Sequence, residues 1–70
     1  MIVYDRLWKT IEKKGISQYS LIHDYNINEA QLDRFRKNSV IKTVTIDRLC
    51  SILDCNVEDI CQYVKEEIEK

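Results

Sequence analysis

The sequence predicts an all-α domain of five helices spanning residues 1–70 as a single unit. Apolar residues recur at the three- and four-residue spacing of helices along most of the chain. Each predicted helix also has a start or stop signal, and no segment has the turn chemistry of a β-hairpin. A chain of 70 residues with no proline and one glycine has neither the length nor the composition of two domains joined by a linker.

The first predicted helix ends at Lys13-Lys14-Gly15. The two lysines lie near the negatively polarised end of the helix, and glycine adopts the left-handed conformation that stops it. One helix face carries four residues at i, i+3, i+4 and i+7: Tyr4, Leu7, Trp8 and Ile11. The apolar residues Met1 to Val3 are expected either to pack on the first or last helix or to line a partner surface.

The segment from Ser17 to Lys37 predicts two short helices joined by a turn too tight for an ordinary loop. Ser17 and Asn28 can each accept a hydrogen bond from an unpaired amide of the helix that follows. We expect Asn26 to adopt a left-handed conformation and Ile27 to fill the angle between the helices. This is the layout of a helix-turn-helix, which can present one helix to DNA.

The same two helices have a predicted inner face and a predicted capping box. The inner face consists of Leu21, Tyr25, Leu32 and Phe35. Gln31 follows Asn28 by three residues, which is the spacing at which the two side chains cap a helix start reciprocally.

Two further helices are predicted after this pair. Thr43 or Thr45 can cap the fourth helix, and Asn56 with Asp59 forms a capping box that opens the fifth. The apolar face of the fourth helix is predicted to be Ile46, Leu49, Cys50 and Leu53. That of the fifth is predicted to be Val57, Ile60, Cys61 and Val64.

The three cysteines, Cys50, Cys55 and Cys61, are odd in number and fit no CxxC spacing. Free cysteine behaves as a small buried hydrophobe, so we expect these side chains to pack in the core. A zinc site formed with His23 is the alternative, and a response to oxidants also stays open. By itself His23 is expected to be a solvated surface residue. The sequence therefore predicts no metal and no cofactor.

Other functional classes have little support in this sequence. The single histidine has no obvious orienting carboxylate, and one glycine cannot make a glycine-rich phosphate loop. No apolar run approaches the roughly 20 residues that span a bilayer, and the apolar start is too short for a secretory signal. We expect a cytoplasmic protein that is not an enzyme and does not bind membranes.

Charge is distributed unevenly along the chain, although the net charge is only −1. Residues 28–42 carry four basic and two acidic side chains, whereas residues 54–70 carry six acidic and two basic ones. The positive charge follows the second helix of the motif, where a phosphate backbone would pass. A plain solvated surface could show the same division.

These features together resemble the Cro and phage-repressor family, the XRE-type helix-turn-helix regulators of bacteria and phages, which have a lambda-repressor-like fold. The resemblance covers residues 4–64 and assigns the motif to helices 2 and 3. It is carried by Gly15-Ile16-Ser17-Gln18 before Leu21, by the turn Tyr25-Asn26-Ile27-Asn28, by Leu32 with Phe35, and by the stretch from Leu49 to Val57.

The resemblance implies two groups of DNA-contacting residues. Those expected to meet base edges are Asn28, Glu29, Ala30, Gln31 and Arg34. Those expected to meet the phosphate backbone are Gln18, Lys37, Asn38, Ser39, Lys42 and Thr43. In the major groove Arg34 suits guanine, Gln31 suits adenine, and Glu29 suits the amino group of cytosine.

Alternative roles remain for some of these charges. Glu29 also suits the positive end of a helix without any contact to DNA. Asp33 can pair with Arg36 or Lys37 on the helix surface. The chain departs from the family pattern at Ile22, Asn26, Glu29 and Asp33, and the two acidic residues put negative charge on the reading helix.

Two functions are consistent with the sequence. The first is a sequence-specific transcriptional regulator, in particular a repressor, that binds double-stranded DNA as a homodimer on a pseudo-palindromic site. The second is an antitoxin-like or polymerase-associated module that keeps this fold but binds another protein through an acidic C-terminal helix. Arg34 with Gln31 and Asn28 favours DNA, whereas Glu29, Asp33 and the negative net charge favour a protein partner.

Overall fold

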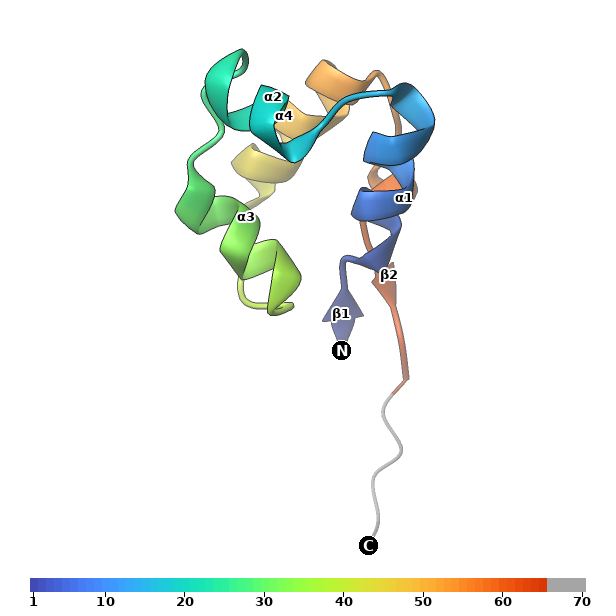
Figure 1. The fold of residues 1–70 in the computed structure, drawn as a ribbon. Coiled ribbons are helices and arrows are strands. Elements are labelled where there is room, and N and C mark those ends of the chain that lie inside the picture. The colour runs from blue at the N-terminus through green and yellow to red at the C-terminus, as the bar shows by residue number, and fades with distance from the viewer. Residues whose placement is uncertain (66–70) are drawn as a thin grey trace, which may run out of the picture.

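The computed structural model describes residues 1–65, which form four α-helices, a 3₁₀ turn and a two-stranded sheet (Figure 1). In chain order the elements are β1 (Ile2–Val3), α1 (Asp5–Lys14), α2 (Gln18–His23), α3 (Glu29–Arg36), α4 (Thr43–Leu53), the 3₁₀ turn η1 (Val57–Asp59) and β2 (Gln62–Tyr63). Helices α1 and α3 lie on opposite sides of the molecule, with α2 and α4 between them at one end and the two strands beside α1 (Figure 1).

One apolar core joins all of these helices. Its buried side chains are Tyr4, Leu7, Ile11, Leu21, Ile27, Leu32, Phe35, Leu49, Leu53 and Ile60. The rings of Tyr4 and Phe35 meet edge to face, with centroids 4.9 Å apart, so the start of α1 packs directly on α3. Most of the predicted core is confirmed, but Tyr25 is exposed because it follows the last turn of α2.

The predicted stop of α1 at Gly15 is confirmed. Gly15 has a φ of 72°, and the amide of Ile16 donates to the carbonyl of Ile11 at 3.0 Å. The Gly15 amide donates in turn to the carbonyl of Glu12 at 3.1 Å. These two bonds satisfy carbonyls that the end of the helix would otherwise leave unpaired.

The predicted fifth helix is wrong. The carboxylate of Asp59 does accept a bond from the Asn56 amide at 3.0 Å, but this capping pair opens only the 3₁₀ turn. The chain then extends into β2, which pairs antiparallel with β1, so that Ile2 lies opposite Tyr63.

The physical reason is the position of the N-terminal segment. The amide of Val64 donates to the carbonyl of Met1 at 2.8 Å, and the Met1 ammonium donates to the carbonyl of Val64 at 2.6 Å. Ile60 is fully buried before β2 begins, and Val64 after β2 is 41% exposed. Met1 to Val3 therefore pair with β2 and do not lie on a helix.

The acidic C-terminal helix proposed as a protein-docking element is not formed within residues 54–65, which hold η1 and β2. Its remaining acidic residues, Glu66, Glu67 and Glu69, lie outside the described residues.

Two predicted helix caps are also wrong. Helix α4 begins after Lys42 without a side-chain cap, and Thr45 is buried. The expected capping box between Asn28 and Gln31 does not form, because the side-chain NH₂ of Gln31 donates to the Thr45 hydroxyl at 3.2 Å. A contact between α3 and α4 therefore takes the place of a local one.

The three cysteines are half-buried against the core, as predicted. Burial, with a contribution from Cys50, raises the pKa of the Cys55 thiol to about 11, and burial also raises the pKa of Cys61. Residues 1–65 contain no group of three or more His, Cys, Asp or Glu side chains placed to hold a metal ion, so the zinc alternative finds no site there. His23 is exposed and stacks on Tyr19, with the ring centroids 4.4 Å apart.

None of the helices between residues 1 and 65 combines the length and the apolar character needed to span a bilayer.

Candidate nucleic-acid interface

The helix-turn-helix forms at α2 and α3 with the predicted caps. The hydroxyl of Ser17 accepts from the Ser20 amide at 3.0 Å, and the side-chain oxygen of Asn28 accepts from the Ala30 amide at 2.7 Å. Each cap satisfies an amide that its helix leaves unpaired at the start. Both helices therefore begin at defined residues on either side of the turn.

The turn itself is set by Asn26 and Ile27. Asn26 has a φ of 59°, the left-handed conformation predicted for it, and the amide of Ile27 donates to the carbonyl of Leu21 at 2.9 Å. The Ile27 side chain is 1% exposed and belongs to the core. A guanidinium nitrogen of Arg48 on α4 also donates to the carbonyl of Tyr25 at 2.8 Å. The angle between α2 and α3 is thus fixed by the burial of Ile27 in the core and by the hydrogen bond from Arg48 on α4.

The opening residues of α3 are open to solvent. Asn28, Glu29, Ala30 and Arg34 are all exposed, whereas Leu32 and Phe35 on the other side of α3 are buried. Four of the five predicted base-reading residues are therefore accessible to solvent.

Gln31 is the exception among the five. It is half-buried, and its amide bond to Thr45 directs the side chain toward α4. Thr45 is only 5% exposed, so this hydrogen bond satisfies a hydroxyl that water does not easily reach. In this arrangement Gln31 joins two helices.

The predicted phosphate-contacting residues divide in a similar way. Those that are exposed are Gln18, Lys37, Ser39, Lys42 and Thr43. Asn38 is half-buried in a left-handed conformation, with a φ of 53°, and its side-chain oxygen accepts from the Tyr4 amide at 3.0 Å. Asn38 thus connects the end of α3 to the start of α1.

The last turn of α3 carries a group of paired charges. The Lys37 ammonium lies 2.9 Å from the Asp33 carboxylate, and the Arg36 guanidinium lies 3.9 Å from it. The predicted surface pairing of Asp33 is therefore confirmed. Because the side chains of Lys37 and Asp33 are 69% and 47% exposed, this pair contributes about 0–1 kcal/mol to stability. Its larger effect is to place a negative charge beside the cation expected to meet phosphate.

Arg36 makes a contact that the sequence did not predict. Its guanidinium donates to the side-chain oxygen of Gln18 at the start of α2 and lies over the ring of Trp8 from α1, 5.9 Å from the ring centroid. Residue spacing revealed the possible pair with Asp33. The contact with Gln18 joins residues 18 positions apart, and local periodicity carries no signal for it.

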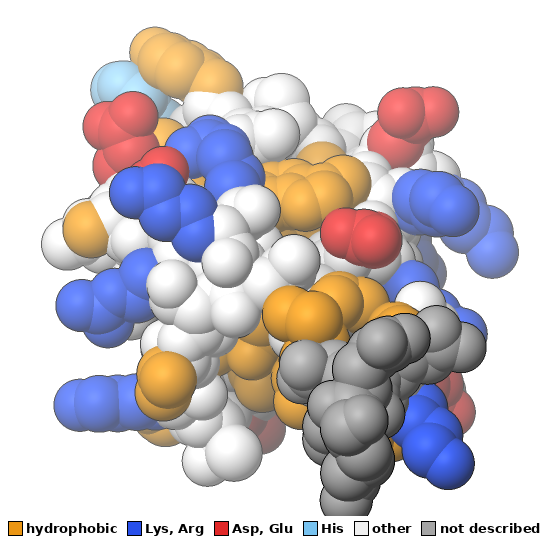
Figure 2. All heavy atoms as spheres, turned by 90° about the horizontal axis from the view of Figure 1, so that it is seen from below, with side chains coloured by type: hydrophobic (Ala, Val, Ile, Leu, Met, Phe, Trp, Pro, Cys, Tyr) orange, Lys and Arg blue, Asp and Glu red, His pale blue; other side chains and the backbone are white. Residues whose placement is uncertain are grey.

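Positive side chains lie on the side of the molecule where α3 lies and also on the opposite side. Figure 2 shows Lys and Arg side chains along both edges of this view, one of which is the edge with α3, while apolar side chains lie closer to the centre. Two of the predicted phosphate-contacting residues, Lys37 and Lys42, flank the loop between α3 and α4. A positive edge beside an exposed helix is the arrangement expected of a surface that follows a nucleic-acid backbone.

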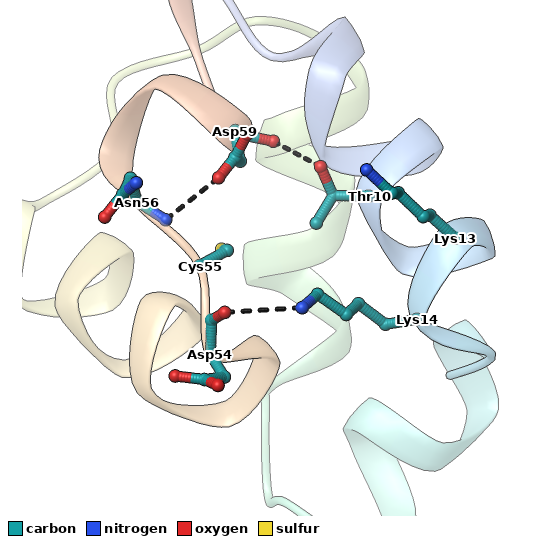
Figure 3. Close-up of a pocket in the computed structure, with 7 residues that line it drawn as sticks. All are labelled: Thr10, Lys13, Lys14, Asp54, Cys55, Asn56 and Asp59. Atoms are coloured by element: carbon teal, nitrogen blue, oxygen red, sulfur yellow. Dashed lines mark hydrogen bonds between the residues drawn. The ribbon is translucent and has the colours of Figure 1, made fainter.

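A polar pocket of about 250 Å³ lies between the end of α1 and the loop from α4 to η1 (Figure 3). The Thr10 hydroxyl donates to the carbonyl of Asp59 at 2.6 Å, and the Lys14 ammonium donates to the carbonyl of Asp54 at 3.4 Å (Figure 3). These bonds hold the segment from Asp54 to Asp59 against α1. The pocket contains none of the predicted DNA-contacting residues.

Comparison with known proteins agrees with this geometry. The family model of the Cro/C1-type HTH DNA-binding domain matches residues 6–66. The fold is similar to that in the crystal structure of the transcriptional regulator VanUg, with a TM-score of 0.82 and 20% sequence identity over 93% of this chain and 87% of that one. No curated protein sequence matches the chain. The family match spans most of the chain and contains both motif helices, so this protein belongs to the Cro/C1-type helix-turn-helix DNA-binding domain family.

Proposed function

We propose that this protein is a sequence-specific transcriptional regulator that inserts α3 into the major groove of double-stranded DNA. The observation that carries the proposal is the exposed row of residues on α3 within a domain of a DNA-binding family. An α-helix fits the major groove, where each base pair presents a distinct pattern of donors, acceptors and methyl groups.

In this proposal the exposed residues of α3 read the bases. Arg34 makes a bidentate pair with guanine, Ala30 contacts a thymine methyl group, and Glu29 accepts from a cytosine amino group. Glu29 has a second effect, because a carboxylate near phosphates disfavours any site that offers it no donor. Asn28 and Gln31 complete the set. Gln31 reaches a base only by giving up its bond to Thr45, so Arg34 supplies the larger share of the specificity.

The residues around α3 contact the phosphate backbone. Lys37, Ser39, Lys42 and Thr43 flank one end of the helix, and Gln18 lies at the start of α2. Asn38 has its oxygen occupied by the Tyr4 amide, which leaves its side-chain N–H groups as donors to phosphate. These contacts fix the register of the protein on the duplex without reading sequence.

We propose that two copies bind together on a pseudo-palindromic site and repress transcription by occupying it. One small domain makes few base contacts, whereas two half-sites about 34 Å apart present their major grooves on the same face of the duplex. The dimer roughly doubles the number of base contacts and the specificity that they provide.

Selection of bound duplexes from a random DNA pool, followed by sequencing, tests this function. We expect a symmetric motif whose half-sites contain a guanine at a fixed position. Binding of a selected duplex should also weaken steeply as salt rises, because phosphate contacts release counterions. An unenriched pool, together with binding that does not depend on salt, would contradict the proposal.

The alternative of a protein-interaction module now has less support than the sequence suggested. It was expected to use an acidic C-terminal helix, and residues 54–65 form η1 and β2 instead, whereas Glu29, Asp33 and the negative net charge still favour it. Failure of the DNA selection would return attention to this alternative.

A further inference from the structure

Three helices meet at the guanidinium of Arg36 in the last turn of α3. One nitrogen donates to the side-chain oxygen of Gln18 at the first position of α2, and another lies 3.9 Å from the Asp33 carboxylate. The guanidinium lies over the Trp8 ring of α1, at a distance within the range of cation–π attraction. Contacts with three different side chains thus restrict the position of this guanidinium.

The contact determines which way the amide of Gln18 faces. An arginine side chain has only donors, so the carbonyl oxygen of Gln18 must be the atom that faces Arg36. The amide group is planar, and its NH₂ therefore points away from the guanidinium. Because Gln18 is exposed, this NH₂ group is accessible to an acceptor outside the protein.

We infer that Arg36 is a positioning residue, which holds Gln18 so that its side-chain NH₂ donates to a DNA phosphate. This inference rests on the proposed function. A glutamine side chain has several rotatable bonds, and ordering it only on binding would cost part of the free energy of the contact. Arg36 orders the side chain before DNA arrives.

The geometry also separates the role of Arg36 from that of a direct phosphate ligand. Its guanidinium is already engaged with Gln18, Asp33 and the Trp8 ring. Gln18 in contrast uses only its oxygen in this contact, which leaves both of its N–H donors outside it. Arg36 therefore affects DNA binding through Gln18.

A double-mutant cycle tests the inference on the full chain. The variants Gln18→Ala, Arg36→Met and the double variant are titrated with a mixed-sequence DNA duplex at several salt concentrations. We expect each single change to weaken binding roughly 3- to 10-fold, which corresponds to the loss of one hydrogen bond. Relative to Gln18→Ala, the double variant should lose only the affinity that removal of one positive charge costs, because Arg36 has no further role once Gln18 is absent.

Removal of a positive charge also weakens DNA binding in a general way, so Lys9→Met serves as the matched control. Lys9 is an exposed cation on α1. The loss caused by Arg36→Met should exceed that caused by Lys9→Met in the wild-type background. The two losses should be equal when residue 18 is alanine. An excess loss that persists in the Gln18→Ala background would show that Arg36 contacts DNA itself and would overturn the inference.

Gln18→Glu provides a second and independent variant. Glutamate keeps the oxygen that accepts from Arg36 but lacks the NH₂ donors, so the folded protein should be at least as stable as the wild type in thermal unfolding. We expect its affinity for the duplex to fall at least as far as that of Gln18→Ala. Wild-type affinity in Gln18→Glu would overturn the inference, whereas failure of the wild-type protein to bind any duplex would overturn the proposed function itself.

Discussion

The side-chain NH₂ of Gln31 on α3 donates a hydrogen bond to the hydroxyl of Thr45 on α4 at 3.2 Å. Thr45 is buried and Gln31 is half-buried, so the bond lies in the interface between α3, the proposed reading helix, and α4. A residue whose position along α3 suits base reading is thereby tied to the interior of the protein.

Removal of this bond should lower stability more than it alters base preference. Gln31→Leu leaves the Thr45 hydroxyl without its partner, and we expect the free energy of unfolding to fall by about 1–3 kcal/mol. Urea unfolding measures this loss. The double variant Gln31→Leu with Thr45→Val removes both polar groups and should recover part of it. If Gln31→Leu left stability unchanged but removed an adenine from the selected motif, Gln31 would be a base reader.

Arg34→Ala should relax the preference at one base pair of each half-site and cost about 1–3 kcal/mol at a site with the preferred base. Lys42→Ala is the matched comparison, because the loss of a phosphate contact weakens all sequences alike and reduces the salt slope by about 1. Competition titrations with single-base variants of the selected site separate the two effects. Unchanged affinity and preference in Arg34→Ala would show that α3 does not lie in the groove as proposed.

Asp33→Asn should strengthen DNA binding. The substitution removes a negative charge from α3 and frees Lys37, whose ammonium lies 2.9 Å from the Asp33 carboxylate, to meet phosphate. We expect the gain to be largest at low salt, because screening weakens interactions between exposed charges. Duplex titrations at two salt concentrations provide the measurement. Equal affinities of wild type and variant at low salt would mean that Asp33 and Lys37 lie away from the bound DNA.

Asn38 should be sensitive to substitution for two separate reasons, its bond to the Tyr4 amide and its φ of 53°. Asn38→Ala removes the acceptor and places a strained residue in the left-handed region, with an expected total cost of about 2–4 kcal/mol. Asn38→Gly removes the acceptor but tolerates the backbone, so it should be about 1 kcal/mol more stable than the alanine variant. Thermal unfolding of both variants checks this order, and the reverse order would contradict the backbone argument.

The Cys55 thiol should react slowly with alkylating reagents, and its raised pKa should make the folded state less stable at alkaline pH. Burial, with a contribution from Cys50, raises its pKa from 9.0 to about 11, so at pH 8 its thiolate fraction is roughly 100-fold below that of an unperturbed thiol. Because the folded state binds this proton more tightly, the stabilisation is complete below about pH 9 and is lost as pH rises toward about 11. Alkylation rates and unfolding from pH 8 to 11 measure both effects, with Cys55→Ala as the control. Equal pH profiles for the two proteins would show that Cys55 contributes no such coupling.

Local sequence determined the helix-turn-helix. The caps at Ser17 and Asn28, the left-handed Asn26 and the buried Ile27 each depend on residues within about one helical turn, or on the alternation of polar and apolar side chains. Such short-range signals can be recognised in one sequence, and the exposed face of α3 follows from the same periodicity.

Tertiary structure decided the pairing of β1 with β2 and the hydrogen bonds between helices. The segment after Asn56 has the pattern of a helix, yet residues 62–63 form a strand because β1, about 60 positions away in the chain, supplies the hydrogen-bonding partner. Gln31 contacts Thr45, and Gln18 contacts Arg36, for the same reason. These pairs are far apart in sequence, and only the packing of α2, α3 and α4 on one core brings their atoms within hydrogen-bond distance.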